Sequence, residues 1–153
     1  MVLMQRRKNE IISEFADYRK GQLQDGRFEL FRSNAKFLDK NTVIKNYSLK
    51  KRQIDLIDKY LKKLKNSNKT HNLVGPSTID ISWDRHINDS LQLSKFIFKK
   101  NSSIIDLGTG AGLPGIILYI YGYTNILLID SKMKKINFIK EFASEQNFEI
   151  KTI

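Results

Sequence analysis

The amino-acid sequence predicts an α/β fold, in which a small parallel sheet with connecting helices follows a basic helical N-terminal region. Over residues 101–153, apolar runs alternate with amphipathic stretches in the order strand, helix, strand, helix, start of a third strand. A glycine-rich stretch separates the first predicted strand from the helix after it. Upstream, apolar residues recur at three- and four-residue steps among many lysines, which indicates an amphipathic helix.

Length and composition exclude several classes of protein. The 153 residues suffice for one domain or little more, and 41% hydrophobic with 28% charged residues is typical of a globular chain. No apolar run approaches the roughly 18 residues of a membrane span, and no apolar stretch follows the basic start as in a secretory signal. Cysteine is absent and only two histidines occur, which argues against disulfides, a cysteine nucleophile and a metal centre. The predicted location is the cytoplasm, with no membrane and no metal.

The positive charge is concentrated in the first half of the chain. Residues 1–70 hold 18 Lys and Arg against 8 Asp and Glu, whereas residues 71–153 hold 9 against 8. This asymmetry favours contact with nucleic acid through the first half. A general compositional bias toward Lys, Asn and Ile is the alternative source of the charge.

The first half divides into a basic extension and a helical region. Residues 1–46 form the extension, to which the sequence assigns no role beyond a helical patch at residues 9–18. The helical region covers residues 47–100. Its first helix is predicted to be capped by Ser48 and to end at Asn66–Asn68, with an apolar stripe formed by Ile54, Ile57, Tyr60, Leu61 and Leu64. A second helical stretch is predicted at about 79–98, with Trp83, Ile87, Leu91 and Phe98 in phase.

Residues 101–153 contain the start of a Rossmann-like domain with an incomplete parallel sheet. The predicted strands are Ser103–Leu107, Asn125–Ile129 and Phe148–Ile153. The predicted helices are Leu113–Tyr121, with Pro114 in its first turn, and Lys132–Gln146, whose inward residues are Met133, Ile136, Ile139, Phe142 and Ala143.

The stretch Asp106–Gly115 (DLGTGAGLPG) is the candidate ligand-binding turn. Gly108 and Gly110 tolerate backbone angles that other residues resist and let a ligand lie against bare backbone. Asp130 closes the next predicted strand, about 20 residues beyond Gly110, where a carboxylate can accept both hydroxyls of a ribose. This strand–turn–helix context favours a nucleotide-like ligand over a merely structural turn.

Two ligand classes fit this turn to different degrees. The spacing of Gly110, Gly112 and Gly115 satisfies G-x-G-x-x-G, so a dinucleotide such as NAD is an alternative. A carboxylate at Asp106 would repel a pyrophosphate and attract a ligand with positive charge. S-adenosylmethionine (SAM) carries an ammonium, a sulfonium and a ribose, and it is the favoured ligand.

These residues resemble the ribosomal RNA small subunit methyltransferase G family, also called glucose-inhibited division protein B. The resemblance rests on the glycine stretch ending in Leu-Pro-Gly, on Trp83–Ser90 (WDRHINDS), on Asn72–Leu73 and on Leu128–Ser131 (LIDS) with Lys134, Lys135 and Phe138. It covers about Tyr47 to the C-terminus. Residues 1–46 match nothing in the family, and Ser67 stands where the family usually has tryptophan.

The resemblance implies a Rossmann-like, SAM-dependent methyltransferase that modifies N7 of a guanine in 16S ribosomal RNA of the small ribosomal subunit. Carried over by position, Gly108 and Leu113 contact SAM, Asp106 and Gly110 line the same pocket, and Asp130 meets the ribose. Guanine N7 has an in-plane lone pair and no proton, so its methylation needs no general base, and positioning supplies most of the acceleration.

Arg85 and His86 are the candidate substrate-binding residues. An RNA phosphate contact and a structural role in packing or hydrogen bonding are both open to this pair, and proton transfer is disfavoured.

Members of the family continue through further strands, so the resemblance implies a truncated form with impaired activity. The alternatives are a non-catalytic RNA-binding remnant and, less favoured, an NAD-dependent oxidoreductase.

Overall fold

The computed structural model describes residues 13–14, 17–18, 21 and 38–153, which fall in two units, residues 1–36 and 37–153. In the first unit the described residues Ser13, Glu14, Asp17, Tyr18 and Gly21 are helical. The remainder of the helical patch predicted at residues 9–18 lies outside the described residues. The second unit contains the sheet and the helices that pack on it.

Three parallel strands form the sheet, in the order β1-β2-β3. They are β1 (Ile104–Leu107), β2 (Ile126–Ile129) and the short β3 (Lys151–Thr152). Ile104 pairs with Ile126 and Leu107 with Ile129, so β1 and β2 end side by side. The sheet confirms the predicted α/β, Rossmann-like class.

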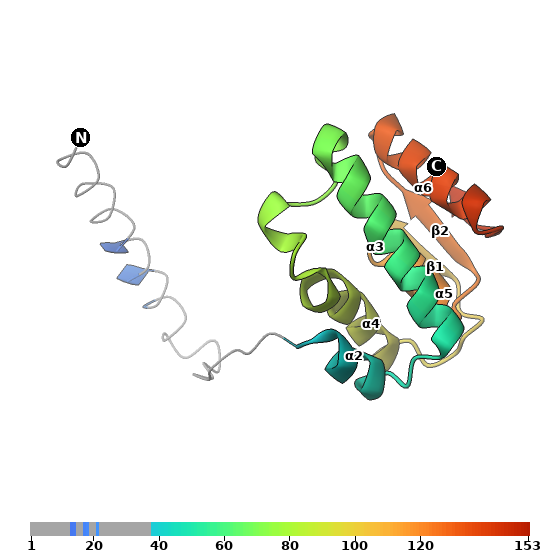
Figure 1. The fold of residues 1–153 in the computed structure, drawn as a ribbon, viewed down its shortest axis with the longest axis horizontal. Helices are drawn as coiled ribbons and strands as arrows, with labels where there is room; N and C mark the ends of the chain where they lie inside the picture. The colour runs from blue at the N-terminus through green and yellow to red at the C-terminus, as the bar shows by residue number, and fades with distance from the viewer. Residues whose placement is uncertain (1–12, 15–16, 19–20, 22–37) are drawn as a thin grey trace. The chain divides into compact units, whose positions relative to one another are not determined.

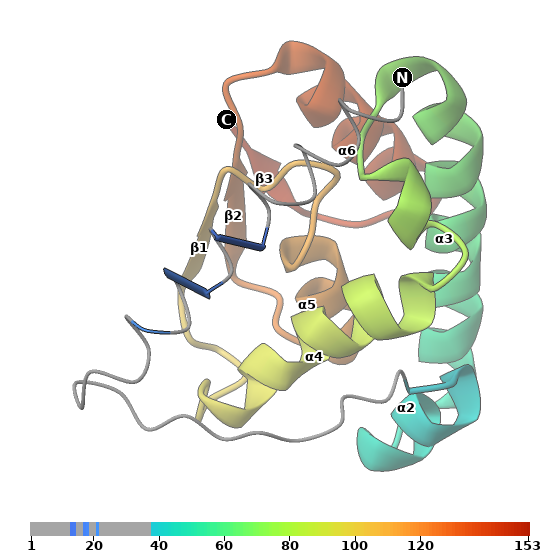
Figure 2. The same cartoon turned by 90° about the vertical axis from the view of Figure 1, so that its left-hand side faces the viewer.

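Helices α3 (Lys51–His71), α5 (Gly115–Tyr121) and α6 (Met133–Glu145) lie on one side of the sheet (Figures 1 and 2). The core between them includes Leu128 of β2, Ile117 of α5, and Ile139 and Phe142 of α6, all fully buried. The prediction that Met133 points inward is wrong: it is the first residue of α6, and 67% of its surface is exposed.

Helix α3 differs from its prediction at both ends. Ser48 does not cap it, because Ser48 has a left-handed backbone (φ 49°) and the helix begins after Lys50, whose N–H donates to Gln53 Oε1 at 2.9 Å. The helix also continues past Asn68 to His71. The buried Asn68 does not stop the helix, because its Oδ1 accepts from the Val74 N–H at 2.8 Å and so stabilises the turn that follows.

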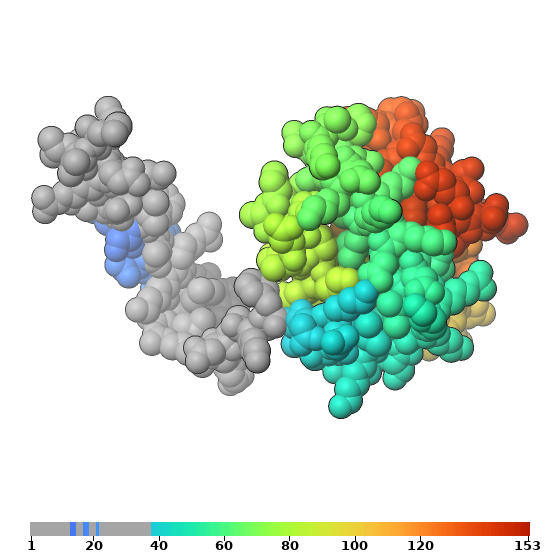
Figure 3. Space-filling view, viewed as in Figure 1, coloured from blue at the N-terminus to red at the C-terminus, as the bar shows by residue number. Residues whose placement is uncertain are grey.

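The predicted apolar stripe of α3 faces the core. Ile57, Tyr60 and Leu64 are fully buried, and each such side chain stabilises the fold by about 1.5–3 kcal/mol. Figure 3 shows that α3 runs between α6 and residues 72–82 on one face of the second unit.

The second predicted helix is a succession of short helical segments. They are η1 (Pro76–Thr78), the π-helical η2 (Trp83–Asn88), α4 (Asp89–Gln92) and η3 (Leu93–Lys95). Ile87 and Leu91 are fully buried as predicted. Phe98 lies beyond the last segment and is 96% exposed, so its assignment to the same apolar face is wrong.

Helix α2 (Lys40–Asn46) belongs to the compact unit that begins at Phe37. The Asp39 carboxylate caps it by accepting from the Asn41 and Thr42 N–H groups, and Val43 is fully buried. The second unit therefore begins before residue 46, which the sequence analysis gives as the last residue of the basic extension.

The opposite face of the sheet is open among the described residues. Ile105 and Leu107 point to this side and are 66% and 80% exposed, and no helix of residues 38–153 lies against them (Figure 2). Within residues 38–153, no helix is long and apolar enough to cross a membrane. The same part of the chain holds no group of three or more His, Asp or Glu side chains that could bind a metal ion.

Candidate functional site

The glycine-rich turn leaves β1 directly beside the end of β2. The N–H groups of Gly108 and Thr109 donate to the Ile129 carbonyl at 2.8 and 2.9 Å, so the turn begins as a continuation of the β1–β2 pairing. Gly110 has φ +61°, a conformation that side-chain-bearing residues rarely adopt. A Cβ added at Gly108 would meet no atom within 4 Å, so this part of the turn has space beside its backbone.

Asp106 holds the turn from inside. Its Oδ2 accepts from Thr109 Oγ1 at 2.7 Å and from the Gly115 N–H at 3.0 Å. Among the described residues, no donor bonds its Oδ1. Burial raises the pKa of Asp106, while these two hydrogen bonds act in the opposite direction. One carboxylate oxygen thus orients the turn and the other is free to face a ligand.

Asp130 contacts the turn from the end of β2. Its Oδ2 accepts from the Gly110 N–H at 3.0 Å, its Oδ1 accepts from the Lys132 N–H at 2.9 Å, and Lys135 Nζ lies 3.4 Å from Oδ2. The Lys132 bond is the largest cause that lowers the pKa of Asp130, and the bond from Gly110 and the charge of Lys135 lower it further. Asp130 is therefore ionised at neutral pH, and it is hydrogen-bonded to the glycine turn through the Gly110 N–H.

Close packing fixes the helix that leaves the turn. A Cβ on Gly115 would overlap Leu128 Cδ2 and would lie 2.9 Å from Asp106 Oδ2. Glycine is thus required here for close approach of α5 to β2. Leu113 precedes Pro114, donates its N–H to the Thr109 carbonyl at 3.0 Å, and packs half-buried against the core.

Tyr60 contacts the glycine turn, although the sequence analysis identified it only as part of the apolar stripe of α3. Its hydroxyl donates to the Ala111 carbonyl in the glycine turn at 3.0 Å, and its ring packs edge-on against Phe138 and Phe142. Burial raises the pKa of Tyr60 far above its usual value, so the hydroxyl stays a donor. Helical spacing shows that Tyr60 points inward but not which carbonyl its hydroxyl reaches.

Arg85 and His86 lie on η2, and no hydrogen bond or ion pair among the described residues joins either of them to the glycine turn. His86 Nε2 is 2.8 Å from Thr78 Oγ1, which itself donates to the Gly75 carbonyl at 2.7 Å. Because the hydroxyl has a single hydrogen, Nε2 is the donor in the first contact. Burial is the largest cause that lowers the pKa of His86, so the ring is neutral near pH 7. The Arg85 side chain is exposed.

The ends of β1 and β2 bring two carboxylates, Asp106 and Asp130, to the same glycine-rich turn. Gly108 and Gly110 leave part of the backbone of this turn without side chains, and the Thr109 side chain between them is buried against Asp106. One carboxylate has a free oxygen, and the second is held ionised. Such a site can bind a ligand that combines positive charge with a diol.

Comparison with known proteins agrees with this geometry. The profile of the GidB family, described as rRNA small subunit methyltransferase G, matches residues 53–153. The ribosomal RNA small subunit methyltransferase G of Orientia tsutsugamushi (strain Ikeda) is 39% identical over 107 residues, which are 69% of this chain and 54% of that protein. The protein of the same name from Rickettsia prowazekii (strain Madrid E) is 40% identical over 100 residues, 65% of this chain and 52% of its own length.

The chain spans about half the length of these curated relatives. The matched part includes α3, the glycine turn and both flanking carboxylates. Taken with the parallel sheet and the turn, these likenesses show that the chain belongs to the rRNA small subunit methyltransferase G family.

Proposed function

We propose that this chain forms the SAM-binding part of a methyltransferase that modifies N7 of a guanine in 16S ribosomal RNA, in the small ribosomal subunit and in the cytoplasm. The observation that carries the proposal is the pair of carboxylates on either side of the glycine turn, with Asp130 bonded to the Gly110 N–H at 3.0 Å. The family membership of the chain supports the reaction class, and its positive charge supports an RNA substrate.

The residues at the turn fit SAM in three respects. The free Oδ1 of Asp106 suits an ammonium or another positive group. The open space beside Gly108 admits a ligand against the backbone, with Leu113 close by on the same turn. Asp130, ionised at neutral pH, suits the hydroxyls of a ribose. When bound, SAM supplies a methyl group on a positively charged sulfur.

The chemistry requires little from the protein beyond positioning. In the transfer, the bond from sulfur to the methyl carbon breaks as the N7 lone pair forms the new bond, and the positive charge moves from sulfur to the base. Guanine N7 has no proton to lose, so no general base is needed. The chain's contribution is to hold donor and acceptor in line and to exclude water. A neutral His86 bonded to Thr78 is consistent with a structural role for that ring rather than with proton transfer.

Two alternative functions lead to different expectations for ligand binding and for methyl transfer. An NAD-dependent oxidoreductase would place a pyrophosphate over Asp106, whose carboxylate repels it. A non-catalytic RNA-binding protein would keep the basic α3 and bind RNA without methyl transfer. We propose Arg85, which is exposed, as a contact for RNA phosphate in either RNA-binding case.

The test is transfer of radiolabelled methyl from SAM to 16S RNA that lacks the modification. Borohydride reduction and aniline cleavage then locate N7-methylguanine. Label at a single guanine N7 supports the proposal. Label on a ring carbon, a ribose or another base contradicts the N7 assignment, and RNA binding without label favours the non-catalytic alternative.

A further inference from the structure

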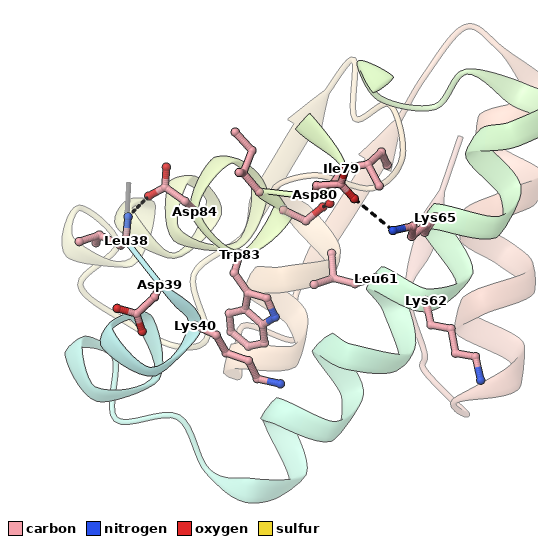
Figure 4. Close-up of a pocket in the computed structure, with 12 residues that line it drawn as sticks. Leu38, Asp39, Lys40, Leu61, Lys62, Lys65, Ile79, Asp80, Trp83 and Asp84 are labelled. Atoms are coloured by element: carbon pink, nitrogen blue, oxygen red, sulfur yellow. Dashed lines mark hydrogen bonds and ion pairs between the residues drawn. The ribbon is translucent and has the colours of Figure 1, made fainter. Parts of the chain in front are cut away.

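A second cavity, unrelated to the glycine turn, lies between α2, α3 and residues 79–84 (Figure 4). Its volume is about 610 Å³, within the usual range for a small-ligand pocket. Apolar side chains form much of its wall: Leu38, Leu61, Ile79, Ile81 and Trp83. We call it the Trp83 cavity.

Trp83 presents a flat aromatic surface to this cavity. The indole projects between Lys40 and Leu61 (Figure 4), is only partly buried, and has Lys40 Nζ over one face of its ring, 5.0 Å from the centroid. A partly exposed indole is a platform on which a planar base can stack.

The acidic residues around the Trp83 cavity are already engaged by the protein. Asp39 accepts from the two N–H groups at the start of α2. Asp84 accepts from the Leu38 N–H at 3.0 Å, and Asp80 pairs with Lys65 at 3.1 Å. Each of the three carboxylates thus accepts a hydrogen bond from, or pairs with, a group of the protein itself.

The lysines around the cavity leave one free positive charge. Lys40 pairs with Asp58 at 2.6 Å and Lys65 with Asp80. Lys62, which also lines the cavity, has no ion pair or hydrogen bond among the described residues, and in Figure 4 its side chain extends from α3 away from Trp83. An apolar pocket with an aromatic platform and one unpaired cation at its side suits a planar group that carries a negative charge.

We propose that the Trp83 cavity binds one nucleotide of single-stranded RNA, with the base stacked on Trp83 and its phosphate at Lys62. This inference rests on the proposed function, since it assumes an RNA substrate, and adds to it a contact site away from the methyl-transfer centre. Helix α3, which contributes Leu61, Lys62 and Lys65, carries seven Lys and Arg against two Asp, so its net positive charge favours a polyanion near this helix. An acidic peptide would satisfy Lys62 but would leave the indole without a planar partner.

The chain contains a single tryptophan, so intrinsic tryptophan fluorescence reports on this cavity alone. The probe is an unmodified single-stranded RNA oligonucleotide, titrated into the full chain. We expect saturable quenching of Trp83 with the same midpoint as the anisotropy of fluorescently labelled RNA. Heparin, a polyanion without bases, is expected to bind the lysines without quenching.

Variants separate the base contact from the phosphate contact. Trp83→Ala should weaken RNA binding by about tenfold, and Trp83→Phe should retain most of the affinity because a ring remains. Lys62→Gln should reduce the slope of log affinity against log salt by about one, as expected for one phosphate contact. Lys69→Gln is the matched control, because it removes the same charge from the same helix outside the cavity, and it should change the affinity less. Circular dichroism checks that each variant is folded, and the quenching and Lys62→Gln results decide the question if Trp83→Ala does not fold.

Several results would overturn the inference. They are RNA binding without a change in Trp83 emission, equal quenching by heparin, absence of RNA binding, and quenching that grows with protein concentration alone, which would indicate a second copy of the chain. The methyl-transfer assay distinguishes this failure from failure of the proposed function. Methyl transfer with unchanged Trp83 emission refutes only the cavity, whereas quenching by RNA without methyl transfer supports the cavity and counts against the proposed reaction.

Discussion

At the residue scale, Asp106 combines two tasks in one carboxylate. Oδ2 ties Thr109 and Gly115 into the turn, and Oδ1 is free toward the space where the ligand is proposed to lie. Thr109 is 1% exposed, so its hydroxyl has no water to replace this partner. Asp106 is therefore expected to affect both folding and ligand affinity, and two substitutions can separate these effects.

Asp106→Ala should lower the free energy of unfolding by about 1–3 kcal/mol, because it leaves the Thr109 hydroxyl and the Gly115 N–H without an acceptor. Asp106→Asn should retain most of the stability, because its carbonyl can accept both bonds. It should still weaken SAM binding through loss of the charge. Chemical denaturation measures the first effect and calorimetric titration the second. Equal stability loss in the two variants would show that the charge, not the hydrogen bonding, holds the turn.

The Asp106→Asn variant also tests a pH dependence of stability. Because burial raises the pKa of Asp106 in the folded state, the stability that this group contributes is present at low pH and is lost as pH rises through the raised pKa. Asp106→Asn does not titrate. Its free energy of unfolding relative to wild type should therefore rise as the pH increases above about 4, the ordinary pKa of an aspartate. Denaturation at several pH values measures this difference, and a fall as the pH increases would mean that the hydrogen bonds to Asp106 outweigh its burial.

At the scale of elements, lysines of α3 tie that helix to α6. Lys63 Nζ lies 2.6 Å from Glu145 Oε1 and 3.4 Å from Glu141 Oε2, with 19% of its side chain exposed. Lys59 bonds Gln146 in the same region. Part of the basic surface that the sequence associates with RNA is thus used inside the protein.

Lys63→Gln should lower the free energy of unfolding by up to about 1 kcal/mol, with a smaller effect at about 0.5 M salt, where ion pairs are screened. Lys62→Gln is the control on the same helix, because Lys62 is exposed and has no ion pair among the described residues, and it should change stability less. Urea denaturation at two salt concentrations measures both. A destabilisation of Lys63→Gln that does not decrease with salt would assign Lys63 to packing of its aliphatic part rather than to the ion pairs.

The sequence predicted the strands and helices of residues 101–153 closely because their patterns are local. An apolar run, a glycine-rich turn and an amphipathic stretch determine β1, the turn and α6 with little help from the rest of the chain. The sequence also placed Asp130 at the end of the second strand, but it did not predict the bond from the Gly110 N–H. The Tyr60 hydroxyl bond to Ala111 joins residues 51 positions apart and leaves no local pattern. The same holds for the exposure of Phe98 and for the helix that continues past Asn68, both of which depend on tertiary contacts.

At the scale of the whole molecule, helices of residues 38–153 cover the sheet on one face only. Parallel sheets are ordinarily covered on both faces. Ile105 and Leu107 of β1 remain exposed on the other face, and beyond β1 no described strand pairs with that edge. An apolar face beside a free edge favours association with other chains.

The 153-residue chain should therefore self-associate as its concentration rises, and the double variant Ile105→Lys with Leu107→Lys should suppress this by placing charge on the exposed face. Met133→Lys is the matched control, since Met133 is similarly exposed but lies on α6, and it should leave association unchanged. Size-exclusion chromatography with light scattering measures the mass of each. A wild-type chain that stays monomeric at every concentration would contradict this prediction.

The central claim is that SAM binds at the glycine turn between Asp106 and Asp130. Calorimetric titration of SAM into the wild-type chain and into Gly110→Val tests this claim directly, because it measures binding and does not depend on methyl transfer. Valine is branched at Cβ, strongly disfavours φ +61°, and would stand where the backbone is proposed to meet the ligand. We expect saturable binding of SAM to the wild type, no comparable binding of NAD, and a loss of about tenfold or more in SAM affinity for a folded Gly110→Val. If Gly110→Val binds SAM as tightly as wild type does, or if NAD binds more tightly than SAM, the glycine turn is not the SAM site.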